Sequence, residues 1–243
     1  MIAPDLLYQR LRAHYGPQDD WWPGQSAFEI MLGAILVQRT RWHNAEQALA
    51  RLRAERALTP AALVAWEPAR LSAAIRPAGF AATKARRLQA LAQWLLDQGG
   101  TAALADRPTP ALRAALLARP GIGEETADAM LLYAFRRPVV VIDAYARRIL
   151  GRLGHPQANA RYGVLQQALV ATLMPGSAAA AGAQRRLADL HALIVTHAQR
   201  HCRVGPRCSG CPLQAGCVHA GGQAELTDRA VGARAGGVPA LPG

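Results

Sequence analysis

Apolar side chains recur at intervals of three and four residues along most of the chain, which is the spacing of one face of a helix. The segment 27–38 (AFEIMLGAILVQ) is apolar on nearly every face, as expected for a helix at the centre of a domain. The β-branched run 139–142 is too short and too isolated to found a sheet, so we expect a buried connector there. The pattern therefore predicts an all-α protein. Further helices are predicted over 4–15, 42–56, 59–66, 83–97, 109–119, 124–135, 144–153, 161–173 and 178–201.

Two of these predicted helices open with Thr-Pro, a pair that places an N-cap before a proline at the first helical position. Thr59 and Thr109 are therefore predicted to be N-caps. The last residues, 220–243, are rich in Gly, Ala and Pro, and we expect a flexible tail there.

The size and composition of the chain fit a folded protein. A length of 243 residues suits one large domain or two small ones, and a hydrophobic content of 51% excludes global disorder. No uncharged apolar run approaches the roughly 18 residues of a membrane span, and the N-terminus lacks a basic-then-apolar leader. We therefore expect a soluble, cytoplasmic monomer with no membrane partner.

The charge balance indicates a polyanionic partner. The chain has 28 basic and 16 acidic side chains, a formal net charge of +12, and nucleic acid is the usual partner of such a protein. Many basic proteins bind no nucleic acid, so charge alone does not decide. All the basic side chains except Lys84 are arginines, as a GC-rich coding sequence would give. Because arginine stays protonated, a mechanism that needs an amine nucleophile has one lysine available.

The cysteines form a single group near the end of the chain. Their spacing is x5, x2 and x5, and two disulfides at such spacing would be strained and unusual in the cytoplasm. Four thiolates in one loop suit a [4Fe–4S] cluster or a tetrahedral zinc. The wide outer gaps favour the larger cluster, while zinc and unmetallated thiols remain alternatives. His201 and His219 flank the loop, but four sulfurs complete a site, so these histidines are not expected to be ligands. The predicted ligands are Cys202, Cys208, Cys211 and Cys217.

The segment 116–134 (LLARPGIGEETADAMLLYA) predicts two helices joined by a tight turn. Pro120 prevents the first helix from continuing, Gly121 and Gly123 permit the turn, and the second helix begins at once. Backbone N–H groups at such a turn can bind a DNA phosphate without reading the base sequence. A plain connection between two helices is the alternative.

Asp143 follows the apolar run 139–142 and precedes a predicted helix. An aspartate at that position can cap the helix. A carboxylate in apolar surroundings can also be partly desolvated, as a catalytic base requires. The sequence does not decide between a cap and a base.

The hairpin, the aspartate and the cysteine loop occur in the order in which they are found in the helix-hairpin-helix DNA glycosylases of the endonuclease III superfamily, and residues 21–217 resemble that family. The resemblance implies a six-helix barrel domain, 27–134, that carries the hairpin. It also implies a cluster domain made of 1–26 and 135–219, with the active site in the cleft between the two domains. In such a protein a damaged nucleotide of double-stranded DNA is flipped out and its base is excised. Asp143 would stabilise the sugar cation and activate the attacking group.

Two departures from the family pattern concern the mechanism and the cluster. The lyase-competent members follow the hairpin with Arg-Lys-Thr, whereas this chain has Glu124, Glu125 and Thr126. Glu125 thus replaces the nucleophilic lysine, and a carboxylate cannot form an imine. Lys84 lies outside that position and is expected to be structural or to face a phosphate. The first cysteine gap is x5, where endonuclease III has x6.

The segment 21–42 (WWPGQSAFEIMLGAILVQRTRW) is similar to the N-terminal signature of the 3-methyladenine DNA glycosylase III-like branch, whose members act by hydrolysis. By that resemblance Trp21, Trp22, Pro23 and Trp42 would line the base pocket. An alkylated purine is cationic, and each aromatic face would add about 0.5–2 kcal/mol of cation–π attraction. Core packing is the alternative role for Trp21 and Trp22, and it is the expected role of two other tryptophans, Trp66 and Trp94.

Gln38 matches a glutamine at the DNA-facing end of the barrel helix in the family. It would fill the gap left by the flipped nucleotide, or it would cap neighbouring carbonyls. Gln38, Gly121, Gly123 and Thr126 are thus the predicted DNA-binding residues. The predicted function is a monofunctional DNA glycosylase that acts on an alkylated purine such as 3-methyladenine. A bifunctional glycosylase and abasic-site lyase for oxidised pyrimidines, and a non-catalytic module that senses DNA damage, are the alternatives.

Overall fold

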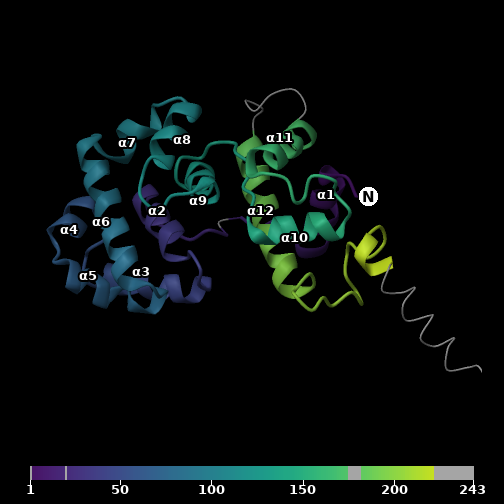
Figure 1. Ribbon diagram of the computed structural model, residues 1–243, viewed down its shortest axis with the longest axis horizontal. Coiled ribbons are helices and arrows are strands. Elements are labelled where there is room, and N and C mark those ends of the chain that lie inside the picture. The colour runs from purple at the N-terminus through teal and green to yellow at the C-terminus, as the bar shows by residue number, and fades with distance from the viewer. Residues whose placement is uncertain (1, 20, 175–181, 222–243) are drawn as a thin grey trace, which may run out of the picture. The chain divides into compact units, whose positions relative to one another are not determined.

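The computed structural model describes residues 2–19, 21–174 and 182–221, and this part of the chain is helical without any strand (Figure 1). The prediction of an all-α fold is confirmed, and the connector 139–142 has no regular secondary structure and is buried at residues 140–142, as expected. The contacts divide the described residues into two units. The first unit holds residues 2–18, 142–174 and 190–221, and the second holds 19, 21–141 and 182–189.

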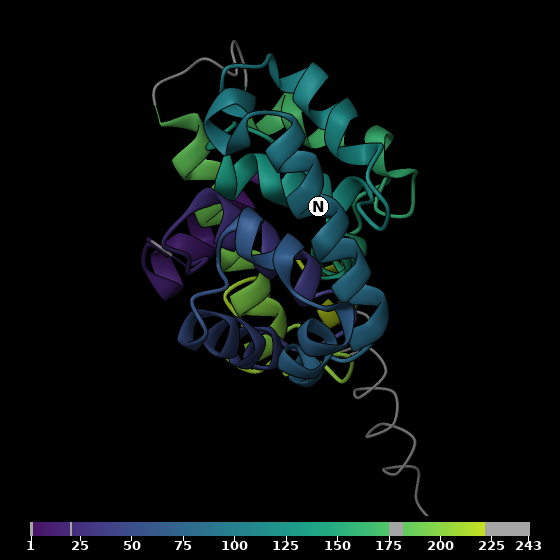
Figure 2. The ribbon, with the colours of Figure 1, turned by 90° about the vertical axis from the view of Figure 1, so that its left-hand side faces the viewer.

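The second unit is a bundle of helices. Figure 2 shows the ribbon of Figure 1 after a turn of 90° about the vertical axis. The elements of this unit are α2 (Ala27–Leu36), α3 (Trp42–Ala54), α4 (Pro60–Ala65), α5 (Pro68–Ala74), the 3₁₀ turn η1 (Arg76–Ala78), α6 (Ala81–Asp97), α7 (Gly100–Ala105), α8 (Thr109–Leu117), α9 (Glu124–Ala129) and the π-helical turn η2 (Met130–Ala134).

The first unit contains α1 (Pro4–Tyr15), α10 (Ala144–Arg152) and α11 (Tyr162–Leu173). The long helix α12 (Ala183–Arg200) contributes residues to both units. The loop that carries the cysteines follows α12.

Helix α2 forms the centre of the second unit, as its uniformly apolar sequence predicts. Leu32, Ile35 and Leu36 are fully buried there, and each such side chain contributes about 1.5–3 kcal/mol of burial free energy. The helix has Ser26 as its N-cap, whose Oγ accepts the Glu29 N–H at 3.1 Å, and Glu29 Oε2 accepts the N–H of Gln25, the residue before the cap, at 3.0 Å.

The helix boundaries agree with the sequence where apolar periodicity is long, and differ where it is short. Thr59 caps α4 by accepting the Ala62 N–H at 3.2 Å, as predicted. The prediction for Thr109 is wrong, because α8 begins at Thr109 itself and Pro108 holds the extended N-cap position. Proline at the second helical position is tolerated, since N–H groups of the first turn have no partner within the helix. The sequence did not predict α5, η1 and α7, whose three to seven residues are too short to show periodicity.

The boundaries between the two units lie at other residues than the expected 26/27 and 134/135. Phe135 lies in the core of the second unit and Val139 packs against it, so that unit continues past residue 134. Residues 182–189 join the same unit, where Gln184 donates to the Leu132 carbonyl at 2.8 Å and Tyr133 donates to the Ala188 carbonyl at 3.3 Å.

The predicted tail, 220–243, is described only at its first two residues. Residues 220 and 221 belong to a helical turn, and Ala220 is buried, so the expectation of a tail is wrong for them. The rest of the predicted tail, and the start of the helix predicted from 178, lie outside the described residues. Among the helices of the described part, none has the length and apolar character to cross a membrane.

Candidate functional site

The turn between α8 and α9 requires glycine at one of its two predicted positions. Gly121 has a φ of +79°, and a Cβ there would lie 2.2 Å from Arg87 Nε, so only glycine fits. Gly123 is the N-cap of α9 with extended backbone, and a Cβ there would meet no atom within 4 Å. The turn is therefore fixed by a guanidinium packed directly against its backbone.

A buried ion pair fastens the two helices of this hairpin together. Arg113 in α8 donates to Asp128 in α9 through Nε at 2.7 Å and through Nη2 at 3.0 Å. Asp128 is fully buried, and Arg113 Nη2 also lies 3.7 Å from Glu124. Because removing one partner of a buried pair costs about 3–5 kcal/mol, this contact is expected to hold the hairpin rigid.

Gln38 is tied into the same hairpin. Its Nε2 donates to the Gly121 carbonyl and to Thr126 Oγ1, each at 3.0 Å, and its Oε1 accepts from Arg87 Nη1 at 3.0 Å. The predicted DNA-binding residues are thus brought together at one place in the second unit. Two roles were considered for Gln38, filling the gap left by a flipped nucleotide and capping neighbouring carbonyls. The structure shows the second kind of contact, because Gln38 binds a carbonyl and a hydroxyl of the hairpin. Arg87 was not predicted, because nothing in the sequence sets it apart among so many arginines.

The only lysine of the chain is buried and structural. Lys84 is 2% exposed, and its Nζ donates to the carbonyls of Leu36, Gln38 and Ala78, each at 2.8 Å. Burial, and then the charge of Arg87, lowers the pKa of Lys84 to about 8. These bonds tie the end of α2 to η1. The sequence analysis predicted that Lys84 is either structural or faces a phosphate. Its three hydrogen bonds to backbone carbonyls agree with the structural role.

Two residues with strained backbone conformations lie next to the segments that Lys84 joins. Arg39 and Phe80 have φ values of +58° and +50°, which residues other than glycine adopt only at a cost. Phe80 is 63% exposed, and the Arg39 guanidinium carbon lies 5.8 Å from the centre of its ring. An exposed aromatic ring under an arginine can stack on a base. Neither periodicity nor a motif in the sequence indicates this pair.

Four aromatic rings meet elsewhere in the second unit. The Trp22 ring centre lies 4.8 Å from Tyr133, 5.5 Å from Trp42 and 6.1 Å from Trp21. Trp22 and Trp42 also pack against the core, and Gly33 of α2 gives both indoles room, because a Cβ there would lie 3.4 Å from one and 3.5 Å from the other.

These contacts bring three of the four predicted pocket residues together. Pro23, the fourth, is exposed. Tyr133, which lies on the π-helical turn η2, was missed by sequence reasoning. Among the remaining tryptophans, Trp94 is buried in the core and Trp66 packs against it, so their predicted packing role is confirmed.

Glu125, which the sequence analysis predicted to stand where lyase-competent glycosylases have a lysine, is exposed in the first turn of α9 next to Glu124. Carboxylates at the first turn of a helix interact favourably with its dipole. Glu125 thus has a local structural explanation.

Asp143 is the N-cap of α10. Its Oδ1 accepts the Ala146 N–H at 2.6 Å, and its side chain is almost completely buried. The capping role is therefore confirmed. The second oxygen, Oδ2, lies 3.7 Å from Nε2 of His191, a buried residue of α12 that sequence reasoning missed. A capping bond uses one oxygen, so the same carboxylate can still act as a base through the other.

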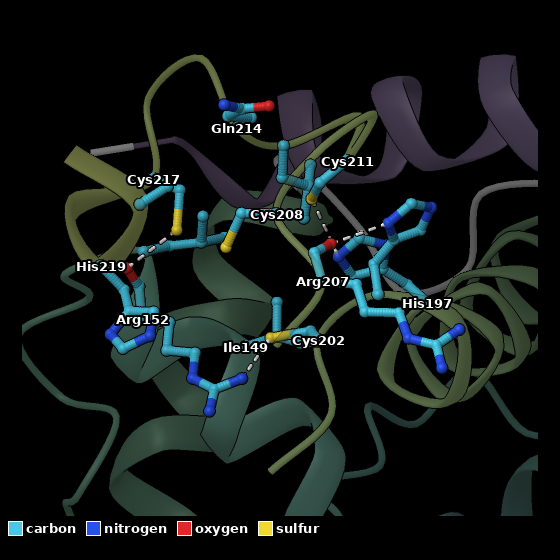
Figure 3. A pocket seen from close by; sticks show the side chains of 14 residues that line it. Ile149, Arg152, His197, Cys202, Arg207, Cys208, Cys211, Gln214, Cys217 and His219 are labelled. Atoms are coloured by element: carbon cyan, nitrogen blue, oxygen red, sulfur yellow. Dashed lines mark hydrogen bonds between the residues drawn. The ribbon is translucent and has the colours of Figure 1, made fainter. Parts of the chain in front are cut away.

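The four cysteines line one pocket of the first unit, together with residues of α10 and α12. Figure 3 shows their sulfur atoms around a common space, and no disulfide links them in the described chain. Burial raises the pKa of the Cys211 thiol, the Leu213 N–H lowers it, and the other three thiols raise it by charge repulsion. In the described residues, no three His, Cys, Asp or Glu side chains converge on the position of one metal ion.

The thiols have both donors and an acceptor beside them: Cys217 Sγ donates to the Arg152 carbonyl at 3.4 Å, and two side-chain nitrogens lie near other sulfurs. Arg152 Nη1 lies 3.3 Å from Cys202 Sγ, and His197 Nε2 lies 3.8 Å from Cys211 Sγ. The other ring nitrogen of His197 bonds the Tyr15 hydroxyl at 3.0 Å, and burial, with His201 and His14 nearby, lowers the pKa of His197 to about 4. Such donors stabilise thiolates.

Comparison with known proteins assigns the chain to a family. The profile of the HhH-GPD superfamily base excision DNA repair proteins matches residues 32–173. This chain therefore belongs to the HhH-GPD superfamily, which confirms the resemblance inferred from its motifs.

Individual relatives agree with that assignment. A Methanocaldococcus jannaschii protein named as a DNA repair glycosylase is 35% identical over 215 residues, 87% of this chain and 94% of that protein. Endonuclease III of Thermotoga maritima is 32% identical over 127 residues, 52% of this chain and 56% of that enzyme.

Solved structures share the fold. The 3-methyladenine DNA glycosylase MagIII of H. pylori, bound to 1,N6-ethenoadenine, has a TM-score of 0.70 at 26% identity, covering 82% of this chain and 98% of its own. A non-covalent endonuclease III–DNA complex has a TM-score of 0.75 at 22% identity, covering 93% of this chain and 100% of its own.

Proposed function

We propose that the protein is a monofunctional DNA glycosylase that removes an alkylated purine base by hydrolysis. The observation that carries the proposal is the state of Lys84, whose three donors bind backbone carbonyls inside the fold. The chain has no second lysine, and Glu125 stands at the family's nucleophile position. A carboxylate cannot form an imine with the sugar, so water is the attacking group.

Asp143 is the proposed catalytic carboxylate. In hydrolysis the bond between the sugar C1′ and the base nitrogen breaks, and the water oxygen forms the new bond at C1′. Positive charge develops on the sugar as the base leaves, and a buried carboxylate stabilises it and accepts the proton from the water. The cap bond from the Ala146 N–H holds Oδ1, so Oδ2 is the oxygen proposed to accept the proton from water.

The aromatic group supports a cationic base as the substrate. Trp21, Trp22, Trp42 and Tyr133 are electron-rich rings that lie together in one unit, and Pro23 adjoins the first pair in sequence. A methylated purine carries positive charge in its ring, so these faces attract it, and it is already a good leaving group. The relationship to MagIII, which is a 3-methyladenine glycosylase, favours the same substrate class.

The hairpin is the proposed grip on the DNA backbone. Backbone N–H groups of the turn at Gly121 and Gly123 suit a phosphate, and Thr126 and Gln38 adjoin it. Arg39 and the exposed Phe80 would contact bases or the opposite strand. Because phosphate neutralisation dominates such binding, affinity is expected to fall steeply with salt.

A [4Fe–4S] cluster is the proposed occupant of the cysteine pocket. Four thiols lining one pocket match the donor set of such a cluster. A single zinc would need its sulfurs within roughly 4 Å of one another, given Zn–S bonds of about 2.3 Å. The wide x5 gaps on either side of the central cysteine pair favour the larger cluster, because zinc sites commonly use two closely spaced pairs. When bound, the cluster would cross-link the loop that follows α12.

The test is a panel of duplexes that each contain one lesion, incubated with the purified protein and then analysed with and without alkali. The proposal predicts base release from a 3-methyladenine duplex, with the strand cut only after alkali. Release of oxidised pyrimidines with strand cleavage before alkali would indicate the bifunctional alternative. Binding of lesions without release of any base would indicate the damage-sensing module.

A further inference from the structure

The two oxygens of Asp143 have different surroundings. Oδ1 accepts the Ala146 N–H at 2.6 Å, and Oδ2 lies 3.7 Å from Nε2 of His191. The Asp143 and His191 side chains are 10% and 8% exposed, so water screens this pair little. The carboxylate is therefore held between a helix terminus on one side and an imidazole on the other.

Both groups that hold Asp143 are rigidly placed. Ala146 is in the first turn of α10, and His191 lies within α12, a helix of 18 residues. Other charged groups of α10 are directed elsewhere: Arg147 donates to the carbonyls of Ala158 and Ala160, and Arg148 donates to the Cys202 carbonyl. Tyr162 of α11 accepts the N–H of the residue before Asp143.

We propose that His191 is a positioning residue for the catalytic carboxylate, acting through its Nε2 on Asp143 Oδ2. The inference rests on the proposed function, in which Asp143 is that carboxylate. One cap bond to Oδ1 leaves the planar carboxylate some freedom to turn about its Cβ–Cγ bond, and the imidazole 3.7 Å from Oδ2 limits this rotation. His191 thus keeps Oδ2 in the one orientation in which it accepts a proton from water. His191 itself does not touch the substrate.

Three substitutions separate positioning from packing. The amide nitrogen of Gln reaches the place of Nε2, that of Asn reaches the place of Nδ1, and Leu keeps bulk without a donor. Because small misplacements of a reacting group cost up to about 100-fold in rate, His191→Asn and His191→Leu should slow single-turnover base release about 10- to 100-fold. His191→Gln should recover most of the rate. All three variants should bind a duplex with a stable abasic analogue as tightly as the wild type.

Equal rates for the Gln and Asn variants would overturn the proposal, since packing does not distinguish the two nitrogen positions. Weaker duplex binding with an unchanged rate of base release would overturn it too.

A spectroscopic measurement on the full chain tests the contact without relying on activity. In ¹⁵N-histidine NMR spectra, His191→Gln identifies the His191 signals, and the Nε2 signal should shift in Asp143→Asn. An unchanged Nε2 signal would show that the two side chains do not interact. A wild-type protein that releases no base from any duplex would instead refute the proposed function and the catalytic role of the contact, while the NMR result would still decide whether the contact exists.

Discussion

Replacement of Lys84 by methionine is the most informative perturbation of the fold, because it removes a buried ammonium and keeps the length of the side chain. Two of the three hydrogen bonds of Lys84, to the carbonyls of Leu36 and Ala78, are buried, and the third, to Gln38, is partly buried. A buried acceptor without a partner costs about 1–3 kcal/mol. Water can reach the third carbonyl, so two orphaned acceptors lower the free energy of unfolding by about 2–6 kcal/mol.

Urea unfolding followed by circular dichroism measures this loss. Arg86→Met is the matched control, since Arg86 is exposed on the same helix, and it should change the free energy of unfolding by less than about 0.5 kcal/mol. At a temperature at which Lys84→Met remains folded, base release per folded molecule should stay close to the wild-type value. A variant that unfolds like the wild type but releases no base would refute the structural role of Lys84 and make it part of the chemistry.

Further predictions concern the carboxylate, the hairpin, the cluster and pH. Asp143→Asn keeps an N-cap, so its thermal stability should change little, while base release should fall about 10²- to 10⁴-fold with duplex binding intact; equal activity would exclude Asp143 as the base. Gly121→Ala collides with the guanidinium beneath the turn and should weaken duplex binding in a fluorescence assay, whereas Gly123→Ala meets open space and should bind normally; equal affinities would contradict the hairpin geometry. Purified protein should absorb near 400 nm and lose that band in Cys211→Ser, whereas colourless protein with one zinc would show the other metal. The pKa of Lys84 is about 8 in the fold and about 10.4 in the unfolded chain, so the unfolded chain binds more protons between those two pH values. The free energy of unfolding of the wild type should therefore rise with pH across that window, and that of Lys84→Met should not.

The sequence predicted the elements whose signals are local. Helix α1 has the predicted bounds, because its apolar spacing, a proline in the first turn and a terminal Gly16 are all contiguous. The turn at Gly121 was predicted for the same reason, and the cap at Asp143 was one of the two roles that the sequence left open. In each case a few neighbouring residues determine the backbone conformation.

The contacts that shape the site join residues far apart in the chain, and no local pattern encodes them. Gly121 is fixed by Arg87, 34 positions away, and Asp143 faces His191, 48 positions away. Tyr133 joins the tryptophans only because η2 brings its ring beside Trp22. Such partners follow from the packing of helices against one another, so a structure was needed to find them.

Attack by water rather than by an amine is the central claim, and borohydride trapping on an abasic-site duplex tests it most directly. Borohydride reduces an imine between a protein amine and the sugar to a stable covalent adduct. The account predicts no adduct through a lysine side chain, and a strand that stays intact until alkali is added. A stoichiometric adduct that Lys84→Ala abolishes, together with strand cleavage before alkali, would contradict it.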